Sequence, residues 1–174
     1  VCFGGDLVEH PRFLDEALRE LRAVNKPMYG VPGNHDYWNK VPFETVAECF
    51  RATGGDWLCD TNVFLHDGKV AIIGLTGNGS VAPPILDMTS TQIILVHYPD
   101  WTKEQGGRSW DLILAGHSHG GQVRLPLVGS VLRWVDGEPY ERGMRQSPAG
   151  PLYVSAGVGT FLIPFRFFCR PEIV

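Results

Sequence analysis

The chain has 174 residues, of which 44% are hydrophobic and 20% charged, the size and composition of one globular domain. Its 21 glycines and 13 prolines require many turns between short elements, which excludes a long helical bundle. The 15 basic and 19 acidic residues give a net charge of −4, so no bulk positive field attracts nucleic acid or an anionic membrane. We expect a single domain over residues 1–174.

The first elements alternate between strand and helix. The apolar run 1–3 is typical of a strand, and residues 12–24 carry leucines on one face of an amphipathic helix. A short strand over 27–31 and a second helix over 43–53 follow. This order predicts an α/β fold with helices packed on a sheet. Because the chain opens partway through an apolar run, we expect the given sequence to start within a strand.

Strands dominate the rest of the chain. Residues 63–65 and 70–75 flank an Asp-Gly pair, which predicts a hairpin. The apolar runs 92–96 and 112–115 are typical of strands buried on both faces, and the polar connection 98–110 between them has room for a helix. Further strands are expected around Val123, Val131 and Tyr140 and over 152–155 and 165–168, with turns at Asp136-Gly137 and Ala149-Gly150-Pro151.

The cysteines and the apolar tail bear on the compartment. Because Cys2, Cys49, Cys59 and Cys169 show no Cys-x-x-Cys spacing, we interpret them as buried thiols in a reducing, cytoplasmic setting. No signal-peptide pattern is visible at the start. The apolar segment 161–168 is far shorter than the roughly 20 residues of a spanning helix. We expect it to be an interior strand, while peripheral contact with the inner membrane stays open.

Four polar clusters each follow an apolar strand directly. They are Gly5-Asp6, Gly33-Asn34-His35-Asp36, His97, and Gly116-His117-Ser118-His119. In an α/β sheet the loops beyond the carboxyl ends of the strands form the ligand crevice. We therefore expect the four clusters to converge in space.

The residue types in these clusters favour a metal site. One carboxylate, one amide oxygen and several imidazoles, with no thiolate, suit Mn, Fe or Zn better than Ca. His117 and His119 are two residues apart, so in extended backbone their side chains point to the same side. The sequence predicts that both face one metal cluster.

Each residue also has a purely structural interpretation. His97 alone is typical of a core histidine, Asn34 of a turn, and Asp6 of a helix cap. The conjunction of four clusters favours ligand roles over these separate explanations. We interpret Asp36 as a structural residue that orients His35.

A serine hydrolase is the main alternative among enzyme classes. Residues 116–120 fit Gly-x-Ser-x-Gly, the nucleophile elbow, with Ser118 as nucleophile. The triad order requires a later histidine, but the only histidine after Ser118 is His119 within the motif itself, which argues against this class. Candidates for holding the oxygens of a phosphorylated substrate are Arg108, Arg124 and Gln122.

These motifs together resemble the calcineurin-like metallophosphoesterase superfamily, whose signature runs D-x-H, G-D, G-N-H-D/E, a lone H, and G-H-x-H. The chain matches the last four in order, and the run Gly116-His117-Ser118-His119-Gly120-Gly121-Gln122 is most similar to a bacterial branch that contains small membrane-associated phosphoesterases. The tail 152–160 is similar to that branch too. The D-x-H motif is absent from this chain.

The resemblance implies a fold and a set of roles. The fold is a four-layer α/β/β/α sandwich, here without its first strand. Asp6 would bridge two divalent ions, Mn, Fe or Zn, with Asn34, His97 and His117 completing one site and His119 in the other, which stays incomplete without D-x-H. His35 would contact the phosphate and protonate the leaving group, so that His35 and Asp6 are the expected catalytic residues.

The expected function is metal-dependent hydrolysis of a phosphoester or pyrophosphate bond by a metal-bound hydroxide. The expected partner is a small phosphorylated or lipid-linked substrate, with a membrane surface open. Because D-x-H is absent, a catalytically silent metal-binding domain is the alternative. A nuclease is disfavoured by the net charge of −4.

Overall fold

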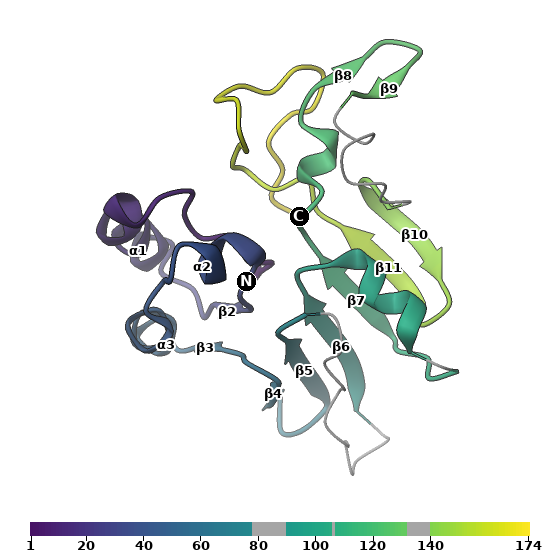
Figure 1. Ribbon diagram of the computed structural model, residues 1–174. Helices are drawn as coiled ribbons and strands as arrows, with labels where there is room; N and C mark the ends of the chain where they lie inside the picture. The colour runs from purple at the N-terminus through teal and green to yellow at the C-terminus, as the bar shows by residue number, and fades with distance from the viewer. Residues whose placement is uncertain (78–89, 106, 132–139) are drawn as a thin grey trace.

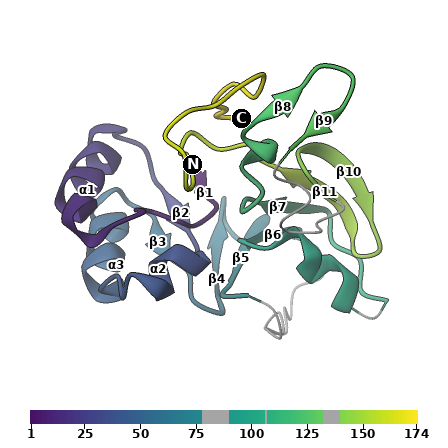
Figure 2. The same ribbon diagram turned by 45° about the horizontal axis from the view of Figure 1, so that its top comes forward.

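The computed structural model describes residues 1–77, 90–105, 107–131 and 140–174, whose strands form two main sheets and a small hairpin (Figures 1 and 2). The smaller sheet is parallel, in the order β1-β2-β3, and consists of Cys2–Phe3, Tyr29–Gly30 and Asp56–Trp57. The larger sheet has the order β10-β11-β7-β6-β5-β4, with strands Gly143–Ser147, Gly150–Val154, Leu112–Ala115, Thr91–Val96, Val70–Leu75 and Thr61–Leu65. Its inner strands β11, β7, β6 and β5 are parallel, and both edge strands are antiparallel. The hairpin pairs β8 (Arg124–Leu125) with β9 (Gly129–Ser130).

Helices pack on the smaller sheet. These are α1 (Leu14–Ala23), preceded by the 3-10 turn η1 (Pro11–Phe13), and α3 (Phe43–Ala52). Their apolar faces share one core with the strands, which includes Leu18, Phe50 and Trp57. The remaining helical segments are the short α2 (Asn34–Trp38) and the 3-10 turns η2 (Pro99–Glu104) and η3 (His119–Gly121).

Two further cores define the layers. Tyr29 of β2 packs with Ile72 of β5 and Leu95 of β6, so this core lies between the two sheets. The neighbouring Ile73 points the opposite way, into a core on the outer face of the larger sheet that Trp101 of η2 covers. The chain is therefore layered as helix, sheet, sheet and covering segment, which confirms the expected mixed α/β sandwich.

Most expected elements are present. The hairpin, the two buried strands and both amphipathic helices lie where their patterns predict them, and the polar connection contains η2. The short elements α2, β3 and η3 were not predicted, and the strand expected around Tyr140 begins later, at Gly143 of β10. The expected turn at Asp136-Gly137 lies outside the described residues.

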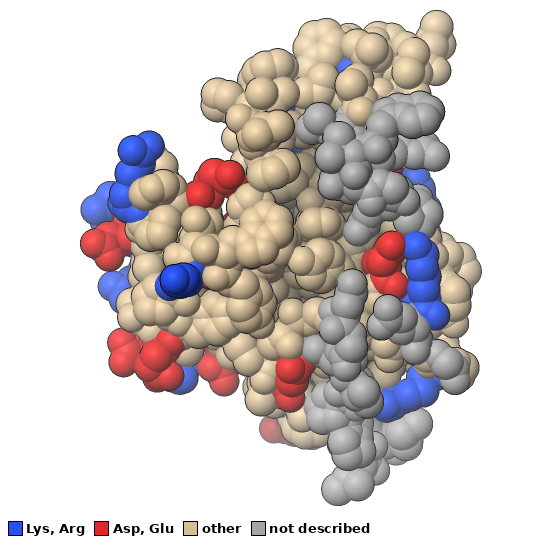
Figure 3. Space-filling view, viewed as in Figure 1, with Lys and Arg blue, Asp and Glu red and all other residues tan. Residues whose placement is uncertain are grey.

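The expected interior strand over 165–168 is wrong. Phe165 and Phe168 are 54% and 67% exposed, and this segment forms only a single bridge, from Phe167 to Val123. Left-handed backbone at Leu162 and Phe168, with φ of 63° and 48°, interrupts the extended conformation that a strand needs. The segment instead curves beside the β8–β9 hairpin, where Figure 3 shows a surface with few charged side chains.

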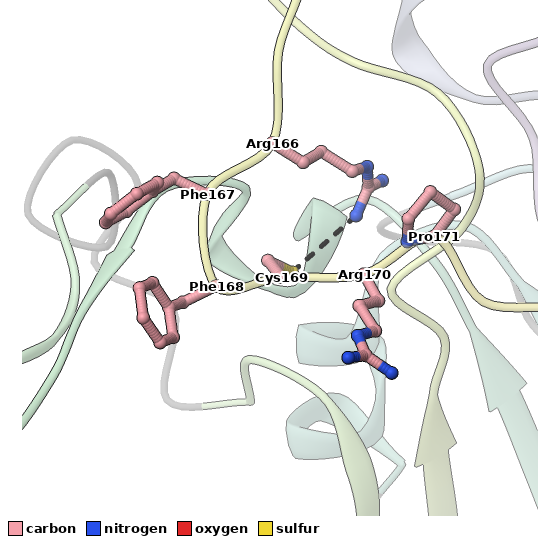
Figure 4. Close-up of a pocket in the computed structure, with 6 residues that line it drawn as sticks. All are labelled: Arg166, Phe167, Phe168, Cys169, Arg170 and Pro171. Carbon is pink, nitrogen blue, oxygen red and sulfur yellow. Dashed lines mark hydrogen bonds between the residues drawn. The ribbon is translucent and has the colours of Figure 1, made fainter.

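The expectation of four buried thiols is correct for two. Cys49 and Cys169 are buried, Cys59 is partly buried and Cys2 is exposed. Cys2 is exposed because it lies in β1, an edge strand of the smaller sheet. Cys169 lies in a shallow pocket lined by residues 166–171, where Arg166 points toward its sulfur (Figure 4).

Candidate metal centre

Four side chains from four strand ends converge on one point. Asp6 and Asn34 follow β1 and β2 of the smaller sheet, whereas His97 and His117 follow β6 and β7 of the larger one. His97 Nε2 lies 3.0 Å from Asn34 Oδ1, 3.1 Å from His117 Nδ1 and 3.3 Å from Asp6 Oδ2. The predicted convergence is therefore present, but it joins the carboxyl ends of two sheets rather than one.

His97 is at the centre of this group and is 1% exposed. Its Nδ1–H donates a 2.6 Å hydrogen bond to the carbonyl oxygen of Gly4, which fixes the ring and leaves the lone pair of Nε2 directed at the other three atoms. A histidine that binds a metal through one ring nitrogen usually donates the N–H of the other to a carbonyl or carboxylate.

Asp6 adopts a left-handed backbone, with φ of 58°, that a non-glycine residue rarely occupies. The fully buried carboxylate of Asp36 stabilises this turn by accepting the N–H groups of Asp6, Leu7 and Gly33 at 2.8–2.9 Å. Asp36 therefore joins the loops after β1 and β2.

Asp36 is a structural residue, as expected, but it does not orient the His35 ring, because its oxygens accept those backbone N–H groups. The partner of the His35 ring is Glu9, whose Oε2 lies 3.0 Å from His35 Nδ1. His35 also donates its backbone N–H to Asp6 Oδ1 at 2.9 Å. Nothing in the local pattern around Glu9 indicated this role, because the contact crosses 26 residues of sequence.

Two glycines allow the loops to approach so closely. A Cβ at Gly33 would lie 2.1 Å from Asp6 Oδ1, and one at Gly5 would lie 2.7 Å from His97 Nδ1. Gly5 also has a φ of 92°, which side chains disfavour. Any larger residue at either position would displace a side chain of the centre.

The protonation states suit cation binding. Burial, the largest single influence, raises the pKa of Asp6, but the hydrogen bond and charge of His97 and the backbone N–H of His35 together lower it. Burial, assisted by the neighbouring His97, lowers the pKa of His117 to about 4. At neutral pH Asp6 is thus a carboxylate and His117 a neutral imidazole.

His119 is not a member of this cluster. Asp6, His97 and His117 present ligand atoms within 4.8 Å of one another, whereas the ring of His119 stacks on Phe161 with centroids 6.4 Å apart. The backbone here is not extended as assumed, because φ is 66° at His117 and 50° at His119. The role of His119 at a second ion stays a prediction. Burial lowers the pKa of His119, as does the charge of Arg166, although the nearby Asp6 charge raises it.

The three candidates for holding substrate oxygens have other partners. Gln122 is fully buried, and its amide bonds the backbone of Phe161 and Ile163. Arg124 forms an ion pair with Glu141, and the guanidinium of Arg108 lies 4.4 Å from the centroid of the Trp110 ring.

Ser118 likewise has a structural environment. Its hydroxyl donates to the backbone carbonyl of Glu141 and accepts the N–H of Gly120. These bonds fix the turn after β7, so the serine acts as a local cap rather than as an exposed nucleophile.

The donor set fits a divalent cation. Two ligand atoms about 2.1 Å from one ion and at right angles are about 3.0 Å apart, which is the spacing found around His97 Nε2. A carboxylate, an amide oxygen and two imidazole nitrogens lie at the meeting point, and they are the ligand types that Mn, Fe and Zn accept. Such a cluster of buried acceptors is balanced by a bound cation.

In the described part of the chain, no helix combines the length and apolar character needed to cross a membrane. The exposed apolar residues near the C-terminus lie in loops and in the β8–β9 hairpin.

Comparison with known proteins finds relatives along nearly the whole chain. The family model for calcineurin-like phosphoesterases matches residues 1–121. Phosphodiesterase YaeI of Escherichia coli is 37% identical over 186 residues, covering 99% of this chain and 67% of YaeI. The uncharacterized metallophosphoesterase YkuE of Bacillus subtilis is 29% identical over 190 residues, covering 99% of this chain and 65% of YkuE. An uncharacterized metallophosphoesterase of Helicobacter pylori is 28% identical, and the chain spans 49% of its length. No solved structure matches the chain.

Proposed function

Because the chain belongs to the calcineurin-like phosphoesterase family, we propose that it hydrolyses phosphoester or pyrophosphate bonds with bound divalent metal ions. The observation that carries this proposal is the convergence of Asp6, Asn34, His97 and His117 within hydrogen-bonding distance of one another. In the proposed reaction the attacking group is water, and these four side chains bind the metal.

The four residues would hold one ion, and Asp6 with His119 would contribute to a second. When bound, the ions supply Lewis acidity and lower the pKa of a bound water. Mn, Fe and Zn are the candidates that the nitrogen and oxygen donors favour. Asp6 is suited to contact both ions because its two carboxylate oxygens differ in partner: Oδ2 faces His97, and Oδ1 accepts the N–H of His35.

His35 is the proposed contact to the phosphoryl group and the proton donor to the leaving oxygen. Its backbone is fixed by Asp6, and its Nδ1 is oriented by Glu9. This leaves Nε2 as the atom that transfers the proton. His35 is 8% exposed, so its ring is largely shielded from water at the edge of the metal centre.

The proposed substrate class is a small phosphorylated or lipid-linked compound. Support for an apolar substituent comes from the side of the centre near Phe161, where Leu162 and Phe165 are 77% and 54% exposed. Apolar side chains exposed to this extent can contact an acyl chain or the surface of a bilayer.

The test uses purified protein reconstituted with Mn²⁺ and the generic diester bis(p-nitrophenyl) phosphate. We expect release of p-nitrophenol that is lost in Asp6→Asn and retained in Asp15→Asn, because Asp15 is exposed on α1. Equal rates for the two variants, or no release above the metal-only rate across a panel of diesters and monoesters, would contradict the proposal.

A further inference from the structure

Two aromatic side chains from distant parts of the chain contact the ring of His35. Trp38, at the end of α2, has its ring centroid 4.9 Å away at an interplanar angle of 56°. Phe161, from the segment after β11, lies 5.0 Å away at 74°. These two residues, here called the aromatic pair, differ in accessibility, because Trp38 is 68% exposed and Phe161 only partly so.

Phe161 is held in place by buried hydrogen bonds. The side chain of Gln122, with no exposed surface, accepts the N–H of Phe161 at 2.6 Å and donates to the carbonyls of Phe161 and Ile163 at 2.9 Å each. A fully bonded buried amide of this kind rigidifies the backbone to which it is attached. The backbone that carries the Phe161 ring is therefore held in place before any ligand arrives.

Arg166 anchors the same segment from its other end. Its Nε donates to the carbonyl of Gly159 at 2.8 Å, and its Nη1 donates to the carbonyl of His119 at 3.2 Å. The loop that carries Phe161 is thus tied to the loop that carries His119. Such preorganisation lowers the entropy lost on binding.

Trp38 is the solvent-exposed member of the aromatic pair. A large indole that is 68% exposed leaves an aromatic surface in water beside a shielded histidine. Aromatic rings associate by offset or edge-to-face contacts, which a flat ring can make with an indole. The carboxylate of Glu9, which contacts the same histidine, places negative charge nearby, so a neutral ring fits here better than a second phosphate.

We propose that the aromatic pair binds a flat aromatic ring carried by the leaving group of the substrate. This rests on the proposed function, in which His35 protonates the leaving oxygen. The pair determines specificity: it selects phosphoesters whose leaving group bears a nucleobase or a phenyl ring over those with an aliphatic or bare sugar group. Stacking of one base on an aromatic side chain corresponds to about 5-fold to 150-fold in affinity.

The experiment measures binding by calorimetry to the Mn²⁺-loaded protein, without turnover. The ligands are phosphonate analogues, whose P–C bond is not hydrolysed, of adenosine monophosphate and ribose 5-phosphate, which differ by the base, and of phenyl phosphate and butyl phosphate, which differ by the ring. The aromatic member of each pair should bind at least about fivefold more tightly. A larger ratio for the first pair identifies a nucleobase as the source of the ring, and a larger ratio for the second identifies a simple aryl group.

Trp38→Ala should remove most of that preference while changing the affinity for the ribose 5-phosphate analogue by less than about twofold, because the phosphonate contacts remain. Phe161→Leu should act in the same direction. Phe168→Ala, which removes a ring that is 67% exposed but outside the pair, is the matched control and should leave both ratios unchanged. Circular dichroism checks that each variant is folded.

Equal binding of the aromatic and aliphatic ligands by the parent protein, or an equal loss of both in Trp38→Ala, would overturn the inference. Because these are equilibrium measurements, they separate it from the proposed function: a protein that binds selectively but never hydrolyses contradicts only the proposed reaction. One that hydrolyses diesters without ring preference contradicts only the role of the aromatic pair.

Discussion

The strand-end loops and the C-terminal segment 155–174 contribute to the same site by different means. The loops after β1, β2, β6 and β7 leave regular strands, so the sheets set the positions of their side chains. Residues 155–174 contain no regular strand or helix. The buried side chain of Gln122 and the segment's own Arg166, which bonds the carbonyl of His119, hold them to the site. Figure 3 shows that charged side chains surround α1 and α3, while few lie near β8 and β9 beside the C-terminal segment.

This difference separates the site into two parts. The metal-binding part depends on backbone geometry that two sheets define jointly, and the part that faces the substrate depends on a few buried polar side chains. Substitutions in the first part should therefore change metal affinity, and substitutions in the second should change substrate binding with the metal retained. The following predictions test that separation, beginning with the largest effect.

Replacing His97 should have the largest effect. His97→Ala removes the atom that lies nearest to all three other donors and leaves the Gly4 carbonyl without its 2.6 Å partner. We expect Mn²⁺ affinity, measured by calorimetry, to fall by at least about 100-fold. Loss of a residue that only orients a metal ligand costs up to about 100-fold, and His97 is itself a proposed ligand. His66→Ala, in the exposed hairpin turn, is the control, and an equal loss there would show that the effect is not local.

Asp36→Asn should have the next largest effect, because it should lower both the stability of the fold and the affinity for Mn²⁺. The amide can accept only with one oxygen, so at least one of the three backbone N–H groups loses its partner, at a cost of about 1–3 kcal/mol. Urea unfolding should show this loss, with weaker Mn²⁺ binding because the Asp6 turn relaxes. Unchanged stability would mean that Asp36 does not join the two loops.

Gln122→Met should affect the substrate-facing part alone. The variant keeps the volume but leaves backbone groups of Phe161 and Ile163 unbonded, so we expect a loss of about 1–3 kcal/mol in unfolding free energy. The KM for a diester should rise while Mn²⁺ affinity stays within about twofold. A marked fall in metal affinity would contradict the separation of the two parts.

Acidification should destabilise the metal-free protein through His117. Its pKa falls from an ordinary value of 6.5 to about 4 on folding, so the unfolded chain takes up the proton first. The contribution of His117 to the free energy of unfolding is fully present above pH 6.5 and is lost as the pH falls toward 4. His119, whose pKa is also lowered, adds in the same direction. Unfolding measured across this range should give a shallower slope in His117→Gln, and an unchanged slope would contradict the assignment.

The smallest effect is expected at an exposed ion pair. Arg51 Nη2 lies 2.6 Å from Glu44 Oε1 on α3, and both side chains are largely in water. Arg51→Ala should cost less than about 1 kcal/mol, because solvent screens such pairs. Metal and substrate binding should not change.

The strand-end motifs could be predicted because they depend on which residues follow one another in the sequence. A polar cluster directly after an apolar run identifies the end of a strand, and that rule placed Asp6, Asn34, His97 and His117 correctly near one another. The fold class followed from the same runs, since Ile72 and Ile73 belong to a strand that is buried on both faces.

The remaining features depend on contacts that no local pattern encodes. The left-handed backbone at His117 and His119 turns the two rings away from the arrangement that extended chain would give. Gln122 was a candidate for holding substrate oxygens, but its partners lie 39 and 41 residues further along the chain. Glu9 was missed because an exposed glutamate carries no signal of its own.

The most direct test of the central claim is anomalous diffraction from a crystal grown with Mn²⁺. The structure predicts a peak bonded to Asp6 Oδ2, Asn34 Oδ1, His97 Nε2 and His117 Nδ1. A crystal of the same folded protein with Mn²⁺ bound elsewhere, or with these four atoms separated and no peak among them, would contradict the account.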